Sequence, residues 1–484
     1  MPQLKDESAK EFNRLIIVSN RLPFLLAKGD TNKWQITPSS GGLVAALAPI
    51  LQDKVGLWIG WAGSFERSYP SDMLARASKD AGYTIKPIVL SQNEIDKYYL
   101  GFSNETIWPL FHDLPSLSEF DPSWWAEYQI VNNKFAQVIA ESSSVNDFIW
   151  VHDYHLMLVA RELRNIGVEH RIGFFLHTPF PPIDLFRKLP WRAEILRALL
   201  EYDLIGFQTM RDRNNFIWCV QAIIKGLRID ARRRVSIIET PTREIKAGVF
   251  PISIDFNELI RYAEDDIIND KVNQILQALP NYQIILGVDR LDYSKGIPLK
   301  LKAIKNVLER FHELRGKITL IQIVVPSRED VPEYQRLKIE IEQLVGEING
   351  KWGEPGWTPI QYMFRNFTRT DLIAYYRAAS MALVTPTKDG MNLVAKEYCA
   401  TNIKNDGVLI LSEFAGAARQ LYRDAILVNP YDIEGVANAI HRAYNMSLDE
   451  RKARMRRLRN SIQRRDIYWW LDLFFRAASG SEHI

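Results

Sequence analysis

Short apolar runs recur along the chain, and segments with helical hydrophobic patterns lie between them. The runs are rich in β-branched residues and end at Gly, Pro or polar side chains, which favours buried strands over helices. Strands that alternate with helical segments predict a parallel sheet covered on both faces. In the first half of the chain the strand segments are 14–22, 55–63, 147–158, 171–182 and one that starts at 204–207.

A second series of apolar runs follows residues 229–246, where the pattern degrades. We expect residues 248–255 to begin a second α/β unit. Its predicted strands are 284–288, 318–325, 360–363, 382–384 and 408–411. The predicted fold class is therefore α/β, with parallel strands in both parts of the chain.

Two further segments depart from this alternation. Residues 97–112 are rich in aromatics and turn formers without clean periodicity, so we expect a shaped loop that lines a sugar site or fills a core. The tail, 448–476, has a helical pattern, and eight of the fifteen residues 451–465 are Lys or Arg. A solvated helix face is favoured over nucleic-acid binding, since no aromatics are interleaved with these charges. We expect the first domain to bury the apolar side chains that follow: Trp469, Trp470, Leu471, Phe474 and Phe475.

Composition narrows the class of protein. The chain has 484 residues, 47% of them hydrophobic, which suits more than one domain core, and its net charge of +3 implies no polyanion partner. The two cysteines, Cys219 and Cys399, lie in apolar helical patterns, so we expect a cytoplasmic protein without a disulfide framework. The polar N-terminus lacks a signal-peptide core, and no apolar run approaches the ~20 residues that span a membrane.

Two cations follow one of the predicted strands, in the segment Gly287–Gly296 (GVDRLDYSKG). Arg290 and Lys295 lie five residues apart across a Tyr-Ser turn. Open α/β sheets bind ligands at the carboxyl ends of their strands, and Arg and Lys together suit a diphosphate. The alternative is a surface loop in which Asp289 and Asp292 neutralise the two cations.

Other strand ends carry groups that suit phosphates and sugar hydroxyls. The turns at 39–43 and 385–392 each open a helical pattern, so their backbone N–H groups and the helix dipole favour an anion. Glu397, one turn inside the second of these helices, can accept two vicinal hydroxyls of a ribose, or can form a surface charge pair with Lys396. Arg328 follows another strand as a third cation.

Polar residues also end the strands of the first domain. Arg21, Asp153 and His177 are candidates for positioning a sugar, and an ordinary turn or a buried structural histidine is the alternative. His152 and His155 flank Asp153, but no further Cys, Glu or His repeats this pattern nearby, which argues against a metal. The chain has no GxGxxG, GxxxxGK[ST], HExxH or D-x-D pattern. We therefore expect protein cations and backbone N–H groups to neutralise leaving-group charge, with no metal and no cofactor.

Long and specific segments carry a family resemblance from about residue 14 to 475: SNRLP, SSGGL, YYLGFSN with IWPLFH, WVHDYHLML, FFLHTPFPP, LGVDRLDYSKGIP, VPSRED and DGMNLVAKEY. On these segments the sequence resembles the trehalose-6-phosphate synthase family of nucleotide-sugar glucosyltransferases. The resemblance implies a GT-B fold, in which two Rossmann-like domains with parallel sheets face a cleft. Residues 1–247 would form the N-terminal acceptor-binding domain, joined by the C-terminal helix 462–484. Residues 248–461 would form the nucleotide-sugar-binding domain.

The resemblance also implies an activity and the residues that carry it. The family transfers glucose from UDP-glucose or another NDP-glucose to glucose 6-phosphate, without metal and with retention of anomeric configuration. The catalytic residues would be Arg290 and Lys295 at the donor diphosphate, and Asp153, His177 and Asp389 at the transferred glucose. The other donor contacts would be Gly41, Gly42, Phe367, Leu393, Val394, Ala395, Lys396 and Glu397. The acceptor site would comprise Arg21, Tyr99, Trp108, Asp153 and Arg328.

Two departures leave alternatives open. Lys388 stands where the family usually has Arg, and Ser253 stands where it usually has Gly, so acceptor choice and domain closure are not fixed. A sister enzyme would use glycerol 3-phosphate as acceptor, although its cyanobacterial form lacks counterparts of SNRLP and VPSRED. A pseudo-glycosyltransferase that joins cyclitols and a non-catalytic sugar-phosphate sensor or regulatory subunit are further alternatives, and a sensor has no need of leaving-group cations. Expected partners are the two substrates, without nucleic acid or membrane. Self-association is left open, and a separate phosphatase is expected because no phosphatase domain follows Ile484.

Overall fold

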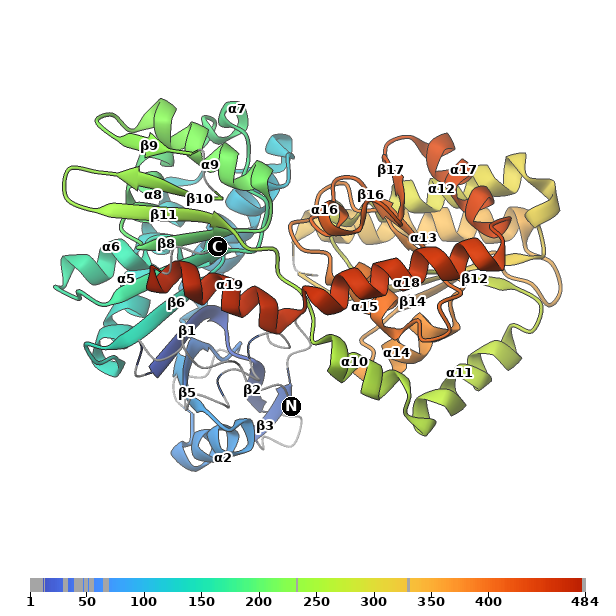
Figure 1. The fold of residues 1–484 in the computed structure, drawn as a ribbon, viewed down its shortest axis with the longest axis horizontal. Helices are drawn as coiled ribbons and strands as arrows, with labels where there is room; N and C mark the ends of the chain where they lie inside the picture. The colour runs from blue at the N-terminus through green and yellow to red at the C-terminus, as the bar shows by residue number, and fades with distance from the viewer. Residues whose placement is uncertain are drawn as a thin grey trace. The chain divides into compact units, whose positions relative to one another are not determined.

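The computed structural model describes residues 14–28, 34–38, 56–63, 69–231, 234–328 and 331–480, together with the single positions 12, 47 and 51. The chain divides into two compact units. Unit 1 comprises Met1–Ile252 and Trp469–Ile484, and unit 2 comprises Ser253–Tyr468 (Figure 1). The predicted donor contacts Gly41 and Gly42 lie outside the described residues.

Unit 1 is built on a sheet whose inner strands are parallel. In spatial order the described strands are β5 (Thr84–Ile88), β4 (Leu57–Trp61), β1 (Arg14–Arg21), β6 (Asp147–His152), β7 (Arg171–Leu176), β8 (Leu204–Phe207), β11 (Glu244–Val249), β10 (Val235–Glu239) and β9 (Arg228–Asp230). β10 runs antiparallel to both of its neighbours. The five strands predicted in the first half of the chain are confirmed as β1, β4, β6, β7 and β8. The sequence did not predict β5, an edge strand that contains a Pro.

Two segments of unit 1 are more regular than their hydrophobic patterns indicate. Residues 97–112, predicted to be a loop, lie in a π-helix, η1 (Ile95–Ile107), and in α4 (Trp108–Phe111). The prediction was wrong because a π-helix closes i→i+5 hydrogen bonds and does not show the 3.6-residue apolar period of an α-helix. Residues 229–246, where the pattern degrades, contribute to the antiparallel ribbon β9–β10–β11 at one edge of the sheet.

Helical segments connect the strands of unit 1, and a hairpin of β2 (Phe24–Lys28) and β3 (Trp34–Pro38) follows β1. The segments are α2 (Ser71–Ala81), α3 (Gln92–Glu94), η1, α4, η2 (Pro115–Leu117), α5 (Pro122–Ser142), η3 (Tyr154–Leu156), α6 (Val159–Asn165), α7 (Ile183–Phe186), α8 (Arg192–Leu199) and α9 (Met210–Ile223). Several begin where the sequence supplies a cap. Asp121 accepts a hydrogen bond from Ser123 N at 2.6 Å before α5, and Thr209 accepts one from Asp212 N at 3.2 Å before α9.

The C-terminal helix α19 (Ile467–Ser479) supplies aromatic side chains to one face of this sheet. The rings of Trp470 and Phe474 lie 5.2 and 4.3 Å from the Trp150 ring on β6, and Figure 1 shows the helix running across the strands. Gly206 on β8 makes room for it, since a Cβ there would meet the Phe474 ring at 3.0 Å. The tail is helical as predicted and forms two helices, α18 (Leu448–Arg464) and α19.

Unit 2 contains a sheet whose described strands are all parallel. Their spatial order is β14 (Ile360–Phe364), β13 (Ile318–Val325), β12 (Gln283–Arg290), β15 (Met381–Val384), β16 (Val408–Ser412) and β17 (Ile426–Val428). β13 is buried along nearly its whole length, as expected for an inner strand with helices on both faces. The five strands predicted after residue 283 are confirmed, and β17 is an additional edge strand.

The helices of unit 2 lie on both faces of its sheet. Figure 1 shows α12 and α13 behind the strands and α15 and α18 in front of them. The described segments are α10 (Phe256–Ala263), α11 (Asp266–Ala278), η4 (Tyr293–Lys295), α12 (Ile297–Arg310), η5 (His312–Leu314), α13 (Pro332–Trp352), α14 (Arg369–Ala378), α15 (Leu393–Thr401), α16 (Ala418–Leu421), α17 (Ile433–Tyr444) and α18.

The arginines of α18 do more than form the solvated face that the sequence predicts. Arg451 donates to the carbonyl oxygens of Ala443 and Tyr444 at 2.8 and 2.9 Å, at the end of α17. Arg459 donates to the carbonyl of Cys399 at 3.2 Å, near the end of α15. Guanidinium groups thus satisfy the last carbonyls of two helices and complement their dipoles. The predicted face is wrong for these two positions because tertiary packing partly buries their side chains against neighbouring helices.

Candidate active site

The strand order of unit 2 reverses between β12 and β15. From β12 the chain passes to β13 and β14 on one side, and then to β15, β16 and β17 on the other. Ligands of open α/β sheets bind beyond the carboxyl ends of the strands at such a switch point. Arg290 is the last residue of β12, Lys295 follows β12, and Asp389 follows β15, so the structure places three predicted site residues at this point.

Lys295 and Asp389 form an ion pair there. Lys295 Nζ donates to Asp389 Oδ2 at 2.6 Å, and both side chains are largely buried. Asp389 Oδ1 accepts hydrogen bonds from the backbone N–H groups of Met391 and Asn392 at 3.0 and 3.1 Å. Asn392 has φ 53° and caps α15, because its Oδ1 accepts from Ala395 N at 3.3 Å. The cation and the helix N-terminus are therefore tied together by one carboxylate.

The other two cations of unit 2 flank a second carboxylate. Arg290 ends β12 and Arg328 lies three residues beyond β13. A guanidinium nitrogen of each lies 4.0 Å from Asp292 Oδ2. Arg328 also donates to the Tyr334 hydroxyl at 2.6 Å, and burial raises the pKa of that tyrosine well above its usual range.

The alternative considered for Gly287–Gly296, a loop in which Asp289 and Asp292 neutralise the two cations, is confirmed for Asp292, which lies 4.0 Å from Arg290, and is wrong for Asp289 and Lys295. Asp289 forms a buried ion pair with Lys300 Nζ at 2.5 Å and accepts from Gln322 Nε2 at 2.9 Å. Lys295 pairs with Asp389 instead, on a loop after another strand. The buried Asp289–Lys300 pair stabilises the end of β12 against α12 and leaves the two candidate cations to other groups.

Helix α15 presents Leu393, Val394 and Ala395 in its first turn, followed by Lys396 and Glu397. The surface charge pair considered for the last two is wrong, because Lys396 is 2% exposed. Burial, with Arg465 nearby, lowers the pKa of Lys396 to about 7. Burial also raises the pKa of Glu397, whose Oε2 accepts from the Tyr376 hydroxyl at 3.0 Å.

Phe367 lies beyond β14 at the same end of the sheet. Its ring is half-buried, packs edge-on against Tyr375 at 5.6 Å, and carries the guanidinium of Arg365 over its face at 4.7 Å. An aromatic face with an adjacent cation offers a stacking surface for a planar ring. This is the environment in which the sequence resemblance places a nucleotide base.

Unit 1 has a switch point of its own, between β1 and β6. From β1 the chain passes to β4 and β5 on one side, and then to β6, β7 and β8 on the other. Arg21 is the last residue of β1, and Asp153 directly follows β6. Two predicted site residues far apart in sequence therefore meet the edge of the sheet where ligands bind.

Aromatic side chains surround Arg21. Its guanidinium carbon lies 4.8 Å from the Trp61 ring and 5.1 Å from the Tyr99 ring. The Tyr99 ring in turn stacks on His155 at 5.9 Å. The flat faces hold an exposed guanidinium in a fixed orientation, which suits recognition of a phosphate.

Trp108 begins α4 and is buried. Its ring lies 4.0 Å from that of His112 and 5.6 Å from that of Tyr154. Tyr154 also contacts His155 at 3.9 Å, so Trp108 and Tyr99 belong to one aromatic cluster. The structure thus brings together three predicted acceptor residues of unit 1, Arg21, Tyr99 and Trp108.

Asp153 has a strained backbone, with φ 72° and ψ 169°. Its Oδ1 accepts from the backbone N–H groups of His177 and Thr178 at 3.2 and 3.3 Å, and Thr178 Oγ1 lies 3.5 Å away. Burial raises the pKa of Asp153 to about 6, and these N–H groups oppose the rise. A strained, partly buried carboxylate at a strand end is a candidate for binding sugar hydroxyls.

His177 belongs to a chain of buried polar groups. Gln208 Oε1 accepts from Ile252 N at 2.9 Å, which turns its amide nitrogen toward His177 Nδ1 at 3.3 Å. His177 Nε2 lies 3.0 Å from His152 Nδ1. We assign the proton of neutral His177 to Nε2, because Nδ1 faces a donor. Burial lowers the pKa of His177 to about 3, so the ring is neutral at physiological pH.

The sequence did not predict the structural roles of several residues that shape these sites. Asp292 and Asn392 each cap a helical segment, and Asp or Asn before a helical pattern is a signal that was available. His152 and Gln208 carry no such signal, because their role depends on contacts across the fold. Among the described residues, no group of three or more His, Cys, Asp or Glu side chains is placed to hold a metal ion. None of the described helices has both the length and the hydropathy for crossing a membrane.

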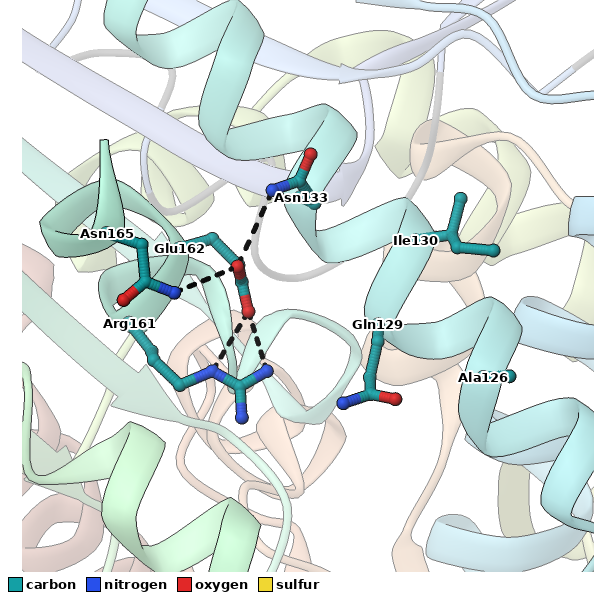
Figure 2. A pocket seen from close by; sticks show the side chains of 7 residues that line it. All are labelled: Ala126, Gln129, Ile130, Asn133, Arg161, Glu162 and Asn165. Carbon is teal, nitrogen blue, oxygen red and sulfur yellow. Dashed lines mark hydrogen bonds and ion pairs between the residues drawn. The ribbon is translucent and has the colours of Figure 1, made fainter.

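One surface hollow of about 650 Å³ lies elsewhere in unit 1, between α5 and α6. Figure 2 shows Glu162 in it, bound by Arg161, Asn133 and Asn165, with Ile130 on the facing helix. None of the predicted site residues lines this hollow, and the hydrogen-bonding capacity of Glu162 is taken up by its neighbours. The candidate site is therefore at the strand ends and not here.

A family model described as glycosyltransferase family 20 matches residues 13–479 of the chain. The chain belongs to this family. It is similar to the trehalose-6-phosphate synthase of Mycolicibacterium smegmatis, with 41% identity over an alignment of 487 positions that covers 99% of this chain and 95% of that protein.

Solved structures of family relatives share the fold. An alpha,alpha-trehalose-phosphate synthase (UDP-forming) from Burkholderia xenovorans, in complex with glucose-6-phosphate, is 36% identical with a TM-score of 0.87, and the match covers 96% of this chain and 100% of that one. An E. coli structure bound with UDP-2-fluoro glucose is 38% identical with a TM-score of 0.85, and covers 96% and 99%. The predicted α/β fold of two Rossmann-like, GT-B-type sheets is confirmed.

Proposed function

We propose that this family 20 glycosyltransferase transfers glucose from UDP-glucose to glucose 6-phosphate with retention of configuration, giving trehalose 6-phosphate and UDP. The C1–O bond to the diphosphate breaks, the anomeric hydroxyl oxygen of glucose 6-phosphate bonds to C1, and the hydroxyl proton leaves with UDP. Support comes from the relatives named trehalose-6-phosphate synthase, among them a UDP-forming enzyme of Dictyostelium discoideum that is 40% identical.

The observation that carries the proposal is the group of cations and N–H groups at the switch point of unit 2. Lys295 is held against the N-terminus of α15 through Asp389, and Arg290 ends β12, the strand that Lys295 follows. A leaving diphosphate gains negative charge as its bond to C1 breaks, so fixed cations and helix N–H groups there stabilise the transition state. The donor would bind this unit, with Glu397 at the ribose and Phe367 at the base. Because protein groups neutralise the charge, we expect activity in the presence of a metal chelator.

In unit 1 the proposed acceptor contacts are Arg21, held between two aromatic rings, at the phosphate, with Tyr99 and Trp108 beside it. In unit 2 the proposed contact to the acceptor phosphate is Arg328. Asp153 would accept hydrogen bonds from sugar hydroxyls. His177 would orient the strand end beside Asp153, since both of its ring nitrogens face protein groups.

Two other functions remain as outcomes of the test. Glycerol 3-phosphate also carries a phosphate and a hydroxyl acceptor, and Arg21 and Arg328 would bind it equally well. A non-catalytic sensor would bind sugar phosphates without releasing nucleotide. The intact Arg290, Lys295 and Asp389 favour catalysis, because a sensor gains nothing from groups that stabilise a leaving diphosphate.

The decisive experiment measures UDP release by the purified protein from UDP-glucose with EDTA present. Glucose 6-phosphate and glycerol 3-phosphate are supplied in parallel reactions, and ADP-glucose and GDP-glucose replace the donor in further ones. Fast release with glucose 6-phosphate alone supports the proposal. Release with glycerol 3-phosphate alone overturns it. The absence of release with both acceptors and all three donors also overturns it.

The same proposal includes a cytoplasmic location. Cys219 and Cys399 are both free and buried, as expected in a reducing compartment. The product would retain the phosphate of the acceptor, so a phosphatase is the class of enzyme that would act next. Size-exclusion chromatography with light scattering would determine whether the protein self-associates.

A further inference from the structure

Asp292 lies between two arginines to which the proposed function gives different substrates. It follows β12, and its Oδ1 accepts from the backbone N–H of Ser294 at 2.9 Å, which caps η4. Its Oδ2 lies 4.0 Å from a nitrogen of Arg290 and 4.0 Å from a nitrogen of Arg328. Because β12 and β13 are paired parallel strands, the two arginines leave the sheet at the same edge.

Burial makes this arrangement energetically important. The Asp292 side chain is 2% exposed and that of Arg328 is 7% exposed, whereas Arg290 is 49% exposed. A buried carboxylate is costly unless nearby cations and hydrogen-bond donors compensate its charge. A backbone N–H donates to one oxygen of Asp292 and two guanidinium groups lie near the other, so both arginines help to compensate its charge.

Arg328 is held from a second side as well. Its Nη1 donates to the Tyr334 hydroxyl at 2.6 Å, and its backbone adopts the left-handed region with φ 49°. A left-handed conformation at a non-glycine residue is sustained only by surrounding contacts. The orientation of this guanidinium therefore depends on both Asp292 and Tyr334.

We propose that Asp292 is a positioning residue. Its buried carboxylate orients both the donor-diphosphate arginine, Arg290, and the acceptor-phosphate arginine, Arg328. The inference rests on the proposed function and adds a residue to it. Without the carboxylate the two guanidinium groups would repel each other and would lose the ion-pair partner that orients both of them. Both substrates would then bind less tightly, although Asp292 touches neither of them.

The test compares Asp292→Asn with the unchanged protein. Asparagine keeps an oxygen that can accept from Ser294 N, so the cap is retained and only the charge is lost. We expect the KM for UDP-glucose and the KM for glucose 6-phosphate each to rise by about tenfold or more, as for truncation of a buried charge pair. Isothermal calorimetry with UDP should show a parallel loss of affinity, and the melting temperature reports stability separately.

Two variants serve as matched controls. Asp121 caps α5 through Ser123 N at the same two-residue spacing but lies on the surface, so Asp121→Asn should leave both KM values unchanged. Tyr334→Phe removes the hydroxyl that contacts Arg328 and leaves Asp292 intact, so it should raise the KM for glucose 6-phosphate alone. A role of Asp292 in capping alone predicts lower stability with unchanged KM values.

A rise in both KM values with Asp292→Asn supports the inference. A rise in only one of them, or in neither, overturns it while the unchanged protein is active. If the asparagine variant does not fold, Asp292→Ser retains a capping oxygen and is judged by the same two KM values. Failure of the proposed function is distinct, because the unchanged protein would then release no UDP with glucose 6-phosphate.

Discussion

Lys295 Nζ donates to Asp389 Oδ2 at 2.6 Å, although 94 residues separate the two in the sequence. Lys295 follows β12 and Asp389 follows the neighbouring strand β15. The other oxygen of Asp389 accepts from the backbone of Met391 and Asn392, at the beginning of α15. The position of the ammonium group therefore depends on the turn that opens this helix, and the cation and the helix N-terminus act on an anion as one group.

The first prediction separates the charge of Lys295 from its contribution to stability. Lys295→Met should lower kcat/KM by about 10²–10³-fold, the order expected for loss of a group that stabilises developing charge. It should also lower the free energy of unfolding by about 3 kcal/mol, because Asp389 stays buried without its cation. Adding Asp389→Asn should restore most of the stability and none of the activity. UDP release and urea unfolding measure the two effects.

An exposed ion pair provides the control for this prediction. Lys305 Nζ lies 2.6 Å from Glu347 on the surface of unit 2, and solvent screens such pairs. Lys305→Met should leave both UDP release and the unfolding midpoint unchanged. If the double variant is as unstable as Lys295→Met alone, the buried charge of Asp389 does not account for the stability loss.

The second prediction concerns the two arginines near Asp292. Arg328→Ala should raise the KM for glucose 6-phosphate by about 10–100-fold and the KM for UDP-glucose far less, since charge-assisted contacts to phosphate are among the strongest hydrogen bonds. Arg290→Ala should raise the KM for UDP-glucose far more than the KM for glucose 6-phosphate. Initial rates with each substrate varied in turn give both constants. Equal damage to both substrates by Arg328→Ala would show that this arginine does not belong to the acceptor site.

The third prediction distinguishes side-chain from backbone contacts on α15. The resemblance makes Lys396 a donor contact, and because its side chain is buried we expect this contact to use the backbone N–H group. Lys396→Met should therefore change the KM for UDP-glucose by no more than about twofold, because Met conserves shape and avoids burying a charge. Glu397→Gln should raise that KM about tenfold, since a carboxylate accepts from two ribose hydroxyls more strongly than an amide. A large effect of Lys396→Met would give the ammonium group itself a role.

The strands and the strand-end residues could be predicted from the sequence because both depend on local patterns. Short β-branched runs predict β12 and β13, and a polar residue directly after such a run lies at the sheet edge, as Arg290 and Asp153 do. The switch points then bring these ends together by topology alone. This part of the site needs no knowledge of side-chain packing.

The pairing of charges could not be predicted in the same way. Asp289 and Asp292 both lie within two residues of Arg290 in the sequence, yet Asp289 pairs with buried Lys300, and Asp292 lies near Arg328 as well as near Arg290. Which carboxylate meets which cation depends on the faces of β12 and on the loops after β13, and these are set by the packed fold. The π-helix η1 was missed for a related reason, because its hydrogen-bond period differs from the one that amphipathic patterns reveal.

The fourth prediction uses the raised pKa of Asp153. Burial raises this pKa from an ordinary value of 3.8 to about 6, so the folded protein binds the proton more tightly than the unfolded chain does. Stability from this group is therefore present at low pH and is lost as pH rises through about 6. Asp153→Asn removes the buried charge, and should raise the free energy of unfolding by about 1–3 kcal/mol at pH 7.5. The gain should disappear at pH 4, where the carboxyl group is already largely protonated.

Unfolding measurements are the cleanest readout for Asp153 because they need no substrate. The phosphate of a sugar phosphate itself titrates near pH 6, so a change in activity in this range would have two sources. The neighbouring His177, whose pKa burial lowers from 6.5 to about 3, destabilises both proteins as pH falls through 6.5, because only the unfolded chain binds its proton, and this effect cancels in the difference between them. Other groups, including Lys396, titrate alike in both proteins and cancel in the difference between Asp153→Asn and the unchanged chain. A stability difference that is the same at pH 4 and pH 7.5 would show that the pKa of Asp153 is not raised. The assignment of Asp153 as a sugar-binding carboxylate with a raised pKa would then lose its basis.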